Sequence, residues 1–403
     1  MLPPSCNRLV GLGIATFTLI VLIFIALHQG GGSIQQIKEA AKNAASSAAS
    51  SAQTHLTTKP TSFGDQISQL YQSIKHPVDS YHYVDPSGME FKVTANPSWK
   101  EPLGNDVLIV DMDTRWPDGD NEVFGKTKLN WENVTGNEGG SMLTASVLNH
   151  FMYAQIHGYD YKFYRAEPME GLHNTWIKPY VLSEFLQSYR FVVFIDADAT
   201  IQHLDVPLEW LFNKWGITHR TSVAMPIDTR QILNGDENAS CDSKGKVTLN
   251  TGFVIAQKLP LTLKMMKAWK DCPTEKKYKG CANWKENWSH EQRAFSEYIR
   301  YDFNPDGDNI IEIPCDDAMG YPGLAKNHPH ILSDCKGRFV RHHTIDKSMT
   351  KTSTSDALLN SLTDIMQKSL MRNKLKYWVS EVERPKEFLE KFKEAEDKRE
   401  GEE

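Results

Sequence analysis

The sequence predicts an α/β fold in which helices flank a Rossmann-like, mixed but mostly parallel sheet. Two short apolar runs, residues 107–110 and 191–195, are bounded by polar residues, as buried strands are. Stretches with the periodicity of amphipathic helices alternate with such strands along the chain, which is typical of this fold class. With 403 residues and 40% hydrophobic content, the chain can bury a large core.

The first half of the predicted sheet follows from this alternation. After the strand at 106–111, residues 141–157 repeat apolar positions at helical spacing, and residues 159–164 alternate as a strand. A second helix at 175–189 leads directly into the strand at 191–195. Strand, helix, strand, helix, strand in this order predicts parallel neighbours joined by right-handed crossovers.

Shorter elements are predicted beyond residue 200. The predicted helices cover 207–215, 261–269 and 289–301, and the predicted strands cover 222–226, 250–256, 310–314 and 338–344. Ser289 and Gln292 have the spacing of a capping box at the start of the last of these helices. The polar stretches 116–140 and 231–246 are expected as surface loops, and residues 71–102 as a wrap around the domain edge.

The N-terminus predicts a single-pass type II membrane anchor. Residues 9–27 carry no charge, and their length suits a bilayer core of ~30 Å, although a cleavage after Ala26 is an alternative. Arg8 precedes this run and the first charge after it is Lys38, so the tail 1–8 is expected in the cytosol. The expected parts after the anchor are a stem and domain-wrapping segment at 28–100, a lumenal catalytic domain at 101–355 and a charged helical tail at 356–403.

Sequons and cysteines agree with a secretory lumen. Three N-glycosylation triplets begin at Asn133, Asn238 and Asn287. The cysteines contain no Cys-x-x-Cys pair, which argues against a zinc or thioredoxin-like site. Plausible disulfides join Cys272 to Cys281 and Cys315 to Cys335, but spacing alone leaves the connectivity open. A net charge of -6 gives no footprint for nucleic acid.

Two carboxylates follow the strand at 191–195, where open α/β sheets bind ligands. Asp196 and Asp198 could converge on one divalent cation that is otherwise held by substrate phosphates. The alternative is that one of them only caps a turn or helix. In the loop expected after the first strand, Asp111, Asp113 and Arg115 are candidates for contact with a base and ribose; the alternative is a solvated loop.

A series of motifs, in this order and spacing, resembles a known family. The motifs are His157-Gly-Tyr-Asp-Tyr161, Trp176-Ile-Lys178, Val193-Phe-Ile-Asp-Ala-Asp198, Asn250-Thr-Gly-Phe-Val-Ile255 and Glu291-Gln292. Together they resemble the galactosyl- and mannosyltransferases of fungal secretory pathways, glycosyltransferase family 34, over residues 143–343. The resemblance implies a GT-A fold, a nucleotide-sugar donor, Mn²⁺ (or Mg²⁺) and transfer with retention of anomeric configuration.

The resemblance also implies a metal site. Asp196 and Asp198 match the Asp-x-Asp pair that holds the metal and the donor diphosphate. The family's further ligand is a histidine near the end of the domain, which matches His342 or His343. A neutral imidazole suits Mn²⁺. The alternative for either histidine is a buried structural role or a contact to the acceptor.

Five further residues match positions that meet the donor in the family. Lys178 is expected near the donor phosphate or ribose, and Asn250 and Gly252 along the sugar pocket. Glu291 and Gln292 match an Asp-Gln pair that faces the donor sugar as the catalytic pair, but the acid here is Glu, one methylene longer. The alternative for Lys178 is an exposed helix lysine, and for Asn250 and Gly252 it is the plain start of a strand. The alternative for Glu291 is an acid that complements the helix dipole.

The predicted function is that of a Golgi membrane hexosyltransferase with a lumenal catalytic domain, with the endoplasmic reticulum as a second possible location. It would transfer galactose from UDP-galactose or mannose from GDP-mannose to a glycan acceptor on protein or lipid, with other glycosyltransferase subunits as candidate partners. The alternative is a catalytically silent lumenal subunit of a glycosyltransferase complex. The stretch around Asp196 and Asp198 offers too few His and Asp ligands for a two-metal hydrolase. A sugar-1-phosphate nucleotidyltransferase would have a Gly-rich phosphate loop early in the chain, and the sequence shows none there.

Overall fold

The computed structural model describes residues 62–93, 96–135 and 139–380, together with residues 390, 391, 393, 394 and 397. The predicted cytosolic tail, the anchor at 9–27 and residues 28–61 of the stem lie outside the described residues, as does most of the charged tail. Among the described residues, no helix combines the length and the apolar character needed to cross a membrane. The described residues other than Ser62 belong to one compact unit, Phe63–Glu403.

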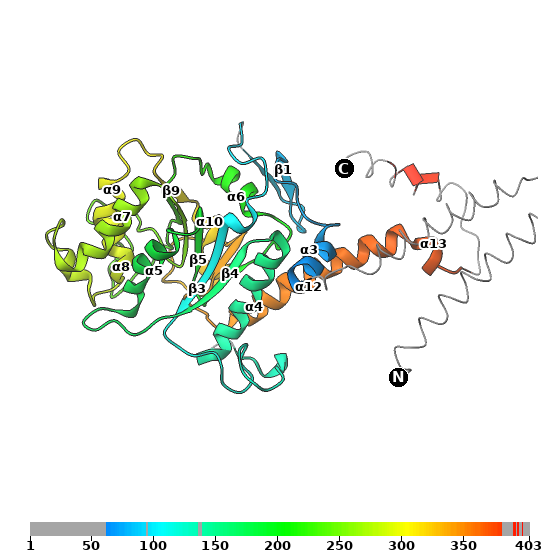
Figure 1. Cartoon of the computed structure of the whole chain (residues 1–403), viewed down its shortest axis with the longest axis horizontal. Coiled ribbons are helices and arrows are strands. Elements are labelled where there is room, and N and C mark those ends of the chain that lie inside the picture. The colour runs from blue at the N-terminus through cyan, green and yellow to red at the C-terminus, as the bar shows by residue number, and fades with distance from the viewer. Residues whose placement is uncertain are drawn as a thin grey trace, which may run out of the picture. The chain divides into compact units, whose positions relative to one another are not determined.

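Helices and strands alternate through most of this unit (Figure 1). The α-helices are α3 (Phe63–Tyr71), α4 (Gly139–His157), α5 (Lys178–Phe185), α6 (Leu208–Trp215), α7 (Pro260–Asp271), α8 (His290–Ala294), α9 (Arg300–Asp302), α10 (Cys315–Ala318), α11 (Leu324–Asn327), α12 (Met349–Arg372) and α13 (Lys374–Tyr377). A π-helical turn, Phe295–Ile299, joins α8 to α9. The strands are β1 (His82–Val84), β2 (Glu90–Lys92), β3 (Val107–Asp113), β4 (Asp160–Arg165), β5 (Phe191–Ile195), β6 (Ala199–Ile201), β7 (Val223–Pro226), β8 (Phe253–Gln257), β9 (Ile310–Ile313) and β10 (Val340–His342).

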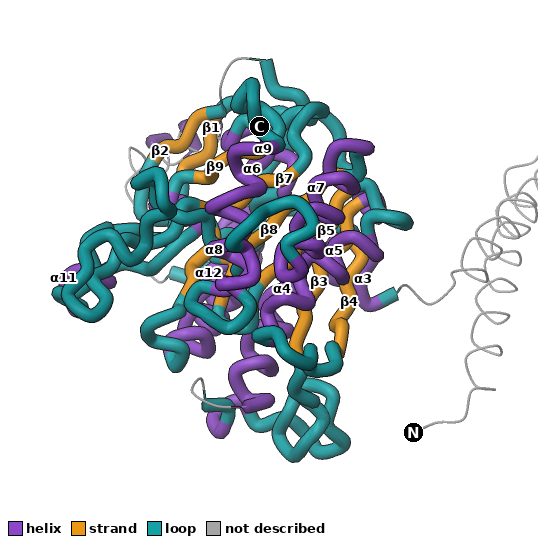
Figure 2. Tube along the Cα trace, turned by 90° about the vertical axis from the view of Figure 1, so that its left-hand side faces the viewer, coloured by secondary structure: helices purple, strands orange, loops and turns teal. Residues whose placement is uncertain are grey.

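The main sheet of the described residues has six strands in the order β4-β3-β5-β8-β7-β9. β3 runs parallel to β4 and β5, and β7 runs parallel to β9. β8 is antiparallel to both β5 and β7. The predicted mixed and mostly parallel α/β sheet is therefore confirmed, and the tube view in Figure 2 shows the helices packed around it.

The central strands are buried on both faces because successive side chains of a strand point to opposite sides. Val107, Ile109 and Val193 belong to one apolar layer, which includes residues of α4 and α6. Leu108 and Val192 belong to the other, which includes residues of α5 and α7. Two covered faces explain why these strands are continuous apolar runs in the sequence. The sheet consequently holds the ends of its strands in fixed positions.

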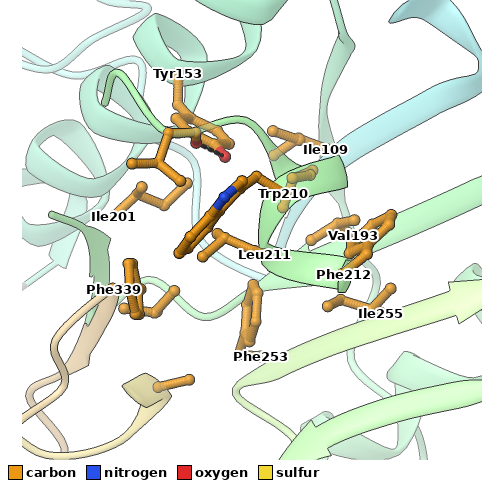
Figure 3. Packing of buried hydrophobic residues seen from close by; sticks show 14 of the residues in the cluster. Ile109, Tyr153, Val193, Ile201, Trp210, Leu211, Phe212, Phe253, Ile255 and Phe339 are labelled. Carbon is orange, nitrogen blue, oxygen red and sulfur yellow. Dashed lines mark hydrogen bonds between the residues drawn. The ribbon is translucent and has the colours of Figure 1, made fainter. Parts of the chain in front are cut away.

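Trp210 of α6 lies at the centre of the first layer (Figure 3). Its indole Nε1 donates a hydrogen bond to the carbonyl oxygen of Ser80 at 2.9 Å. This hydrogen bond holds the segment before β1 against α6. Strands β1 and β2 form a separate two-stranded sheet. Residues 71–93 and 96–102 thus lie outside the main sheet, as predicted.

Most predicted elements are found within a few residues of their expected bounds. Both predicted disulfides are present, Cys272–Cys281 and Cys315–Cys335. The asparagines of the three sequons, Asn133, Asn238 and Asn287, are all exposed. Helix α12 runs across the expected boundary between residues 355 and 356, and Thr354 donates from Oγ1 to the carbonyl of Ala145 in α4 at 3.0 Å. Its first half therefore packs against the domain.

The predicted capping box at Ser289 is wrong. Ser289 makes no side-chain capping bond to α8, and its buried hydroxyl has no hydrogen-bond partner. The Gln292 side chain instead accepts a bond from the backbone N of Thr251 and donates one to Asp228. The Gln292 side chain, which its spacing from Ser289 assigned to the helix end, thus bonds to residues far away in the sequence.

Candidate active site

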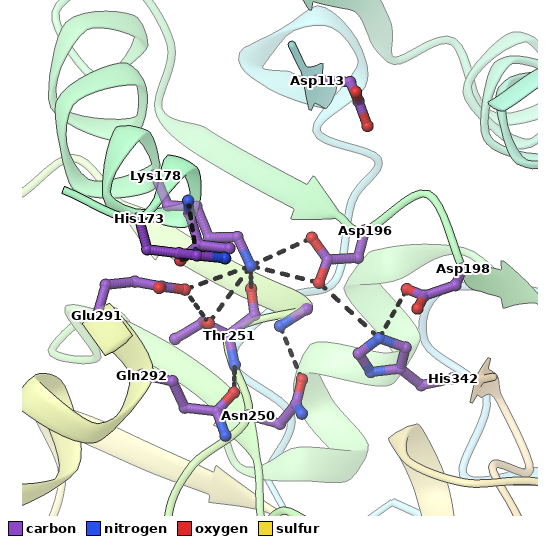
Figure 4. Close-up of polar contacts among 12 residues, drawn as sticks. Asp113, His173, Lys178, Asp196, Asp198, Asn250, Thr251, Glu291, Gln292 and His342 are labelled. Atoms are coloured by element: carbon purple, nitrogen blue, oxygen red, sulfur yellow. Dashed lines mark hydrogen bonds and ion pairs between the residues drawn. The ribbon is translucent and has the colours of Figure 1, made fainter. Parts of the chain in front are cut away.

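The carboxyl end of β5 delivers two carboxylates to the floor of a cavity. Asp196 directly follows β5, and Asp198 lies in the turn before β6. β10 pairs antiparallel with β6 and sets His342 opposite Ala199, beside that turn. The Nε2 atom of His342 lies 3.0 Å from Oδ1 of Asp198 and 3.8 Å from Oδ2 of Asp196 (Figure 4). One possible ligand atom from each of the three residues lies within 4.8 Å of the others.

Strand geometry separates the two neighbouring histidines. His342 faces the carboxylates, whereas the ring of His343 lies 5.3 Å, centroid to centroid, from that of Tyr321. Burial lowers the pKa of His343 to about 3, so its imidazole is neutral. His343 contributes its backbone N, which donates to the carbonyl of Asp198 at 2.8 Å. The structure therefore brings His342 into the cluster and leaves His343 as a support for the turn.

Gly252, just before β8, leaves the space that this cluster occupies. A Cβ at residue 252 would lie 2.1 Å from Cε1 of His342 and 2.8 Å from Oδ2 of Asp196. The absence of a side chain at Gly252 therefore admits the imidazole of His342. Two carboxylates and one imidazole form a donor set that suits Mn²⁺ or Mg²⁺. The residues present therefore fit a divalent cation.

Strong electrostatic coupling marks the cluster. Burial raises the pKa of Asp196. Lys178 acts in the opposite direction and lowers it, whereas the nearby Asp198 carboxylate raises it further, and the net shift is upward. Burial also opposes ionisation of Asp198, but His342 and Lys347 outweigh it and hold its pKa below the ordinary value. Burial would lower the pKa of His342, yet Asp198 raises it overall. Such mutual perturbation is typical of functional sites.

Lys178 is the buried cation of the site. It is the first residue of α5, and its Nζ lies 3.1 Å from Oδ1 of Asp196 and 3.5 Å from Oε1 of Glu291. The same Nζ donates to the carbonyl oxygen of Thr251 at 3.1 Å. Burial disfavours the charge, but Asp196 and Glu291 outweigh it and raise the pKa of Lys178. Lys178 is therefore a charged link between the metal-ligand candidates and the opposite wall.

That wall is a buried network around Thr251. Its Oγ1 donates to Oε1 of Glu291 at 2.7 Å, and its backbone N donates to Oε1 of Gln292 at 3.0 Å. Gln292 and Asn250 both donate to Asp228, at 2.7 and 3.2 Å. Oε2 of Glu291 is buried without a hydrogen-bond partner. The predicted residues Asn250, Glu291 and Gln292 are thus brought together, and one carboxylate oxygen is left available.

These residues line a cavity of about 620 Å³. A smaller cavity of about 130 Å³ adjoins it at the end of β3 and shares Lys178 and Asp196 with it. Lys347, half exposed, lies at the larger cavity with its Nζ 3.3 Å from Oδ2 of Asp198. The larger cavity is within the size range of small-molecule sites. Its polar wall carries acids, amides and two lysines.

The expectation that Asp111 lies in the loop after the first strand is wrong. β3 extends to Asp113, so Asp111 is inside the strand, buried, and accepts hydrogen bonds from His150 and Tyr161. Asp113 lines the smaller cavity and pairs with Arg115, whose NH2 group lies 2.6 Å from Oδ2. Asp113 raises the pKa of Arg115, and Asp198 and Asp196 add to this effect. Arg115 therefore remains close to the acidic cluster, whereas Asp111 does not face it.

Several lining residues were missed by the sequence reasoning. Asp228, Thr251, Trp288, His290 and Lys347 all line the larger cavity. Asp228 and Lys347 belong to none of the motifs quoted from the sequence, and their positions beside the cavity depend on distant contacts. Thr251, Trp288, His290 and Lys347 could have been flagged, because each lies within a few residues of a predicted site residue.

Comparison with known proteins identifies the central part of the chain. Residues 126–304 match the model of the galactosyl transferase GMA12/MNN10 family, which is glycosyltransferase family 34. No curated protein sequence matches the chain. The matched range holds both carboxylates of the Asp-x-Asp pair, Lys178 and the Thr251 wall, whereas His342 and Lys347 lie beyond it.

Several solved glycosyltransferase structures show distant similarity to this chain. One is involved in the glycosylation of the major capsid of PBCV-1, with 14% identity, a TM-score of 0.40, and coverage of 62% of this chain and 98% of that chain. Another is GlyE of Streptococcus pneumoniae TIGR4, with 12% identity, a TM-score of 0.31 and coverage of 57% and 54%. A third is the WbbM bifunctional glycosyltransferase, with 13% identity, a TM-score of 0.32 and coverage of 70% and 54%. This chain spans about half the length of the last two.

The identification therefore depends on the family match, which agrees with the motifs in the sequence. The resemblance is confirmed: residues 126–304 match the model of the galactosyl transferase GMA12/MNN10 family, and this match supports glycosyl transfer as the general activity of this chain.

Proposed function

We propose that this protein transfers a hexose, galactose or mannose, from a nucleotide sugar to a glycan acceptor, with a divalent cation bound by Asp196, Asp198 and His342. The observation that carries the proposal is the convergence of these three side chains on the floor of a cavity of about 620 Å³. The family match over residues 126–304 supports the same class of reaction.

The difficult step in such a transfer is the departure of a nucleoside diphosphate. A divalent cation at the three ligands would act as a Lewis acid toward the diphosphate, and Mn²⁺ is the ion we propose. Lys178 and Lys347 approach the acidic pair from two sides, at 3.1 Å from Asp196 and 3.3 Å from Asp198. Both ammonium groups are thus placed to stabilise negative charge on the leaving phosphates.

The two cavities suggest where the parts of the donor lie. We assign the nucleoside to the smaller cavity at the end of β3, which Asp113 and Thr114 line. These two residues would contact the base and ribose, the role for which Asp111 was also a candidate. The sugar is assigned to the wall formed by Asn250, Glu291 and Gln292. Asp196 and Lys178 line both cavities, which is the position required of residues that meet a diphosphate between nucleoside and sugar.

Retention of configuration is part of the proposal. The acceptor hydroxyl would attack from the face that the diphosphate leaves, or a carboxylate would first form a glycosyl-enzyme. Glu291 is the carboxylate best placed for a covalent role, because Oε1 is held by Thr251 while the buried Oε2 has no partner. In same-face attack, Glu291 would instead orient the sugar hydroxyls.

We also propose a Golgi location with the catalytic unit in the lumen. Residues 9–27 form an uncharged run long enough to span a bilayer. Two disulfides and three exposed sequon asparagines support an oxidising secretory compartment. The acceptor would then be a glycan on protein or lipid in the same lumen.

Donor hydrolysis by the fragment from Ser62 to the C-terminus tests the proposal. The fragment is assayed against a panel of nucleotide sugars, including UDP-galactose and GDP-mannose, with Mn²⁺ or with a chelator. We expect turnover of one donor that requires Mn²⁺ and is lost in Asp198→Asn. Asp334→Asn, which removes an exposed charge paired with Lys336 outside the cavity, is the matched control and should retain activity.

The opposite result has a definite meaning. If the folded fragment neither binds nor hydrolyses any donor of the panel, the catalytic proposal fails and a silent subunit of a glycosyltransferase complex becomes the better description. Turnover that is unchanged in Asp198→Asn would place the active site elsewhere.

A further inference from the structure

A tryptophan lies at the rim of the larger cavity, just before the helix that carries Glu291 and Gln292. Trp288 is the only tryptophan, tyrosine or phenylalanine among the described residues that line this cavity. It is 44% exposed, whereas Glu291, three residues further on, is 2% exposed. The indole therefore lies on the solvent side of the cavity, and the wall to which we assign the donor sugar is buried.

The indole of Trp288 has no partner of its own. In the part of the chain that the structure describes, no aromatic ring, cation or hydrogen-bond acceptor pairs with it. The two other exposed tryptophans each have a cation over the ring. Arg165 lies 4.6 Å from the centroid of Trp116, and Lys374 lies 5.6 Å from that of Trp378. An exposed flat apolar surface beside a polar cavity is thus left unused at Trp288.

The turn that presents Trp288 is held at both ends. The backbone N of His290 donates to the carbonyl oxygen of Asn287 at 2.8 Å. The ring of His290 stacks on that of His173, with centroids 3.6 Å apart and an angle of 5° between the planes. The backbone N of His173 in turn donates to the carbonyl oxygen of Lys285 at 2.9 Å. The indole is therefore presented on a fixed turn, which reduces the entropy cost of binding a ligand against it.

Hydrogen-bonding capacity next to the indole is also unused. Ser289 and His290 both line the cavity, and Oγ of Ser289 and Nδ1 of His290 are buried without a hydrogen-bond partner among the described residues. Buried polar atoms nearly always have a partner, so two such atoms in one turn point to a group that arrives with a ligand. A flat apolar ring with polar atoms beside it suits a pyranose, which has C–H groups on its faces and hydroxyls around its edge.

We propose that the acceptor binds as a pyranose ring stacked on Trp288, with its hydroxyls toward Ser289 and His290. This inference rests on the proposed function and names the chemistry of the acceptor. The group that receives the hexose then belongs to a sugar that is already in place, not to an amino-acid side chain. An earlier glycosyl transfer must consequently supply the acceptor.

The arrangement of the cavities favours the acceptor over the donor as the ligand of Trp288. The nucleoside is assigned to the smaller cavity, which Trp288 does not line. The donor sugar is assigned to the buried wall of Asn250, Glu291 and Gln292. The acceptor reaches that sugar from solvent, and Trp288 combines exposure to solvent with closeness in sequence to the wall.

Acceptor kinetics of the full chain test the proposal. Every variant and the parent carry Asn287→Gln, because Asn287-Trp288-Ser289 is a sequon and a glycan there could differ between variants. Release of the nucleoside diphosphate from the active donor is measured with Mn²⁺ in water alone. It is then measured with increasing methyl pyranosides of mannose, galactose and glucose, or with mannitol, which has the hydroxyls but no ring.

We expect at least one pyranoside to accelerate release, and mannitol to be far weaker. Trp288→Ala should raise the KM for that pyranoside about 10- to 100-fold, because sugar and indole no longer bury apolar surface against each other. The donor KM should change by less than about threefold. Trp288→Tyr keeps a flat ring and should raise the acceptor KM by less than about fivefold. Trp378→Ala, at a tryptophan that is 55% exposed and lines neither cavity, is the matched control.

Four results would overturn the proposal while donor hydrolysis persists. One is an acceptor KM in Trp288→Ala within about twofold of the parent value. A second is a donor KM that rises as much as the acceptor KM, which would identify the donor as the ligand of Trp288. The others are mannitol acting as well as the pyranosides, and no pyranoside accelerating release. Absence of any donor hydrolysis in the parent would instead refute the proposed function, and this inference with it.

Discussion

Gly252 and His342 share one space: a Cβ at residue 252 would lie 2.1 Å from Cε1 of the imidazole. The backbone of Gly252 is outside the left-handed region that favours glycine, so the close approach alone explains the residue. β8 and β10 are not neighbours in any sheet of the described residues. The glycine therefore fixes how closely β10 and its histidine can approach the carboxyl end of β5.

Gly252→Ala should displace the His342 ring while the fold persists. We expect Mn²⁺ affinity to fall by about 10- to 100-fold, the range seen when a residue that supports a metal ligand is lost. Titration calorimetry with Mn²⁺ measures the change. Gly119→Ala is the control, because its Cβ would meet a side-chain oxygen of Glu122, at 3.1 Å. Unchanged Mn²⁺ affinity in Gly252→Ala would mean that His342 is not a ligand.

Lys178→Met should lower the free energy of unfolding by about 3 kcal/mol at pH 7. The reason is that the buried Glu291 and the partly buried Asp196 would lose their shared cation. Lys347→Met should cost less than about 1 kcal/mol, because the side chain is 50% exposed. Urea unfolding of both variants makes the comparison. Equal losses would show that burial does not distinguish the two lysines.

Glu291→Gln should reduce kcat by at least about 100-fold, as expected for a group that acts on the reacting sugar. The amide preserves the volume and can still accept from Thr251, so the donor KM should change little. Glu297→Gln is the matched control, since Glu297 follows in the same helical segment and pairs with Arg293. Steady-state kinetics with the active donor decide the matter. A kcat within a few-fold of the parent would remove Glu291 from the chemistry.

His157 should make the protein less stable in acid. Burial lowers its pKa to about 3, so between that value and its ordinary pKa of 6.5 the unfolded chain binds a proton that the folded chain does not. The contribution is fully present above pH 6.5 and is lost as the pH falls, by about 2 kcal/mol between pH 7 and pH 5.

The variant His157→Gln isolates this effect. Its amide can still donate to the carbonyl of Leu204, which His157 Nε2 approaches at 2.9 Å. Urea unfolding at pH 7 and pH 5 should show a smaller loss of stability in the variant than in the parent. The same pH dependence in both proteins would mean that His157 is protonated in the folded state.

The sequence predicted the parts of the site that local patterns determine. An apolar run ending in Asp196 and Asp198 specifies a buried strand with carboxylates at its end, and that arrangement is found. These predictions succeeded because strand periodicity and the place of ligands in α/β sheets are local or general rules.

The choice between His342 and His343 required tertiary structure. Adjacent residues on a strand face opposite sides, so only the pairing of β10 with β6 decides which ring meets the carboxylates. The same dependence explains the error at Ser289, where Thr251 and Asp228 recruited the Gln292 side chain. Asp228 itself carries no local signal, because its role arises from contacts with Asn250 and Gln292 far along the chain.

The most direct test of the metal site is an anomalous diffraction map of crystals grown with Mn²⁺ and a nucleoside diphosphate. The account predicts a single strong manganese peak between Asp196, Asp198 and His342, with the diphosphate between Lys178 and Lys347. A diphosphate bound in this cavity without manganese at those three residues, or a manganese peak held by other residues, would contradict it.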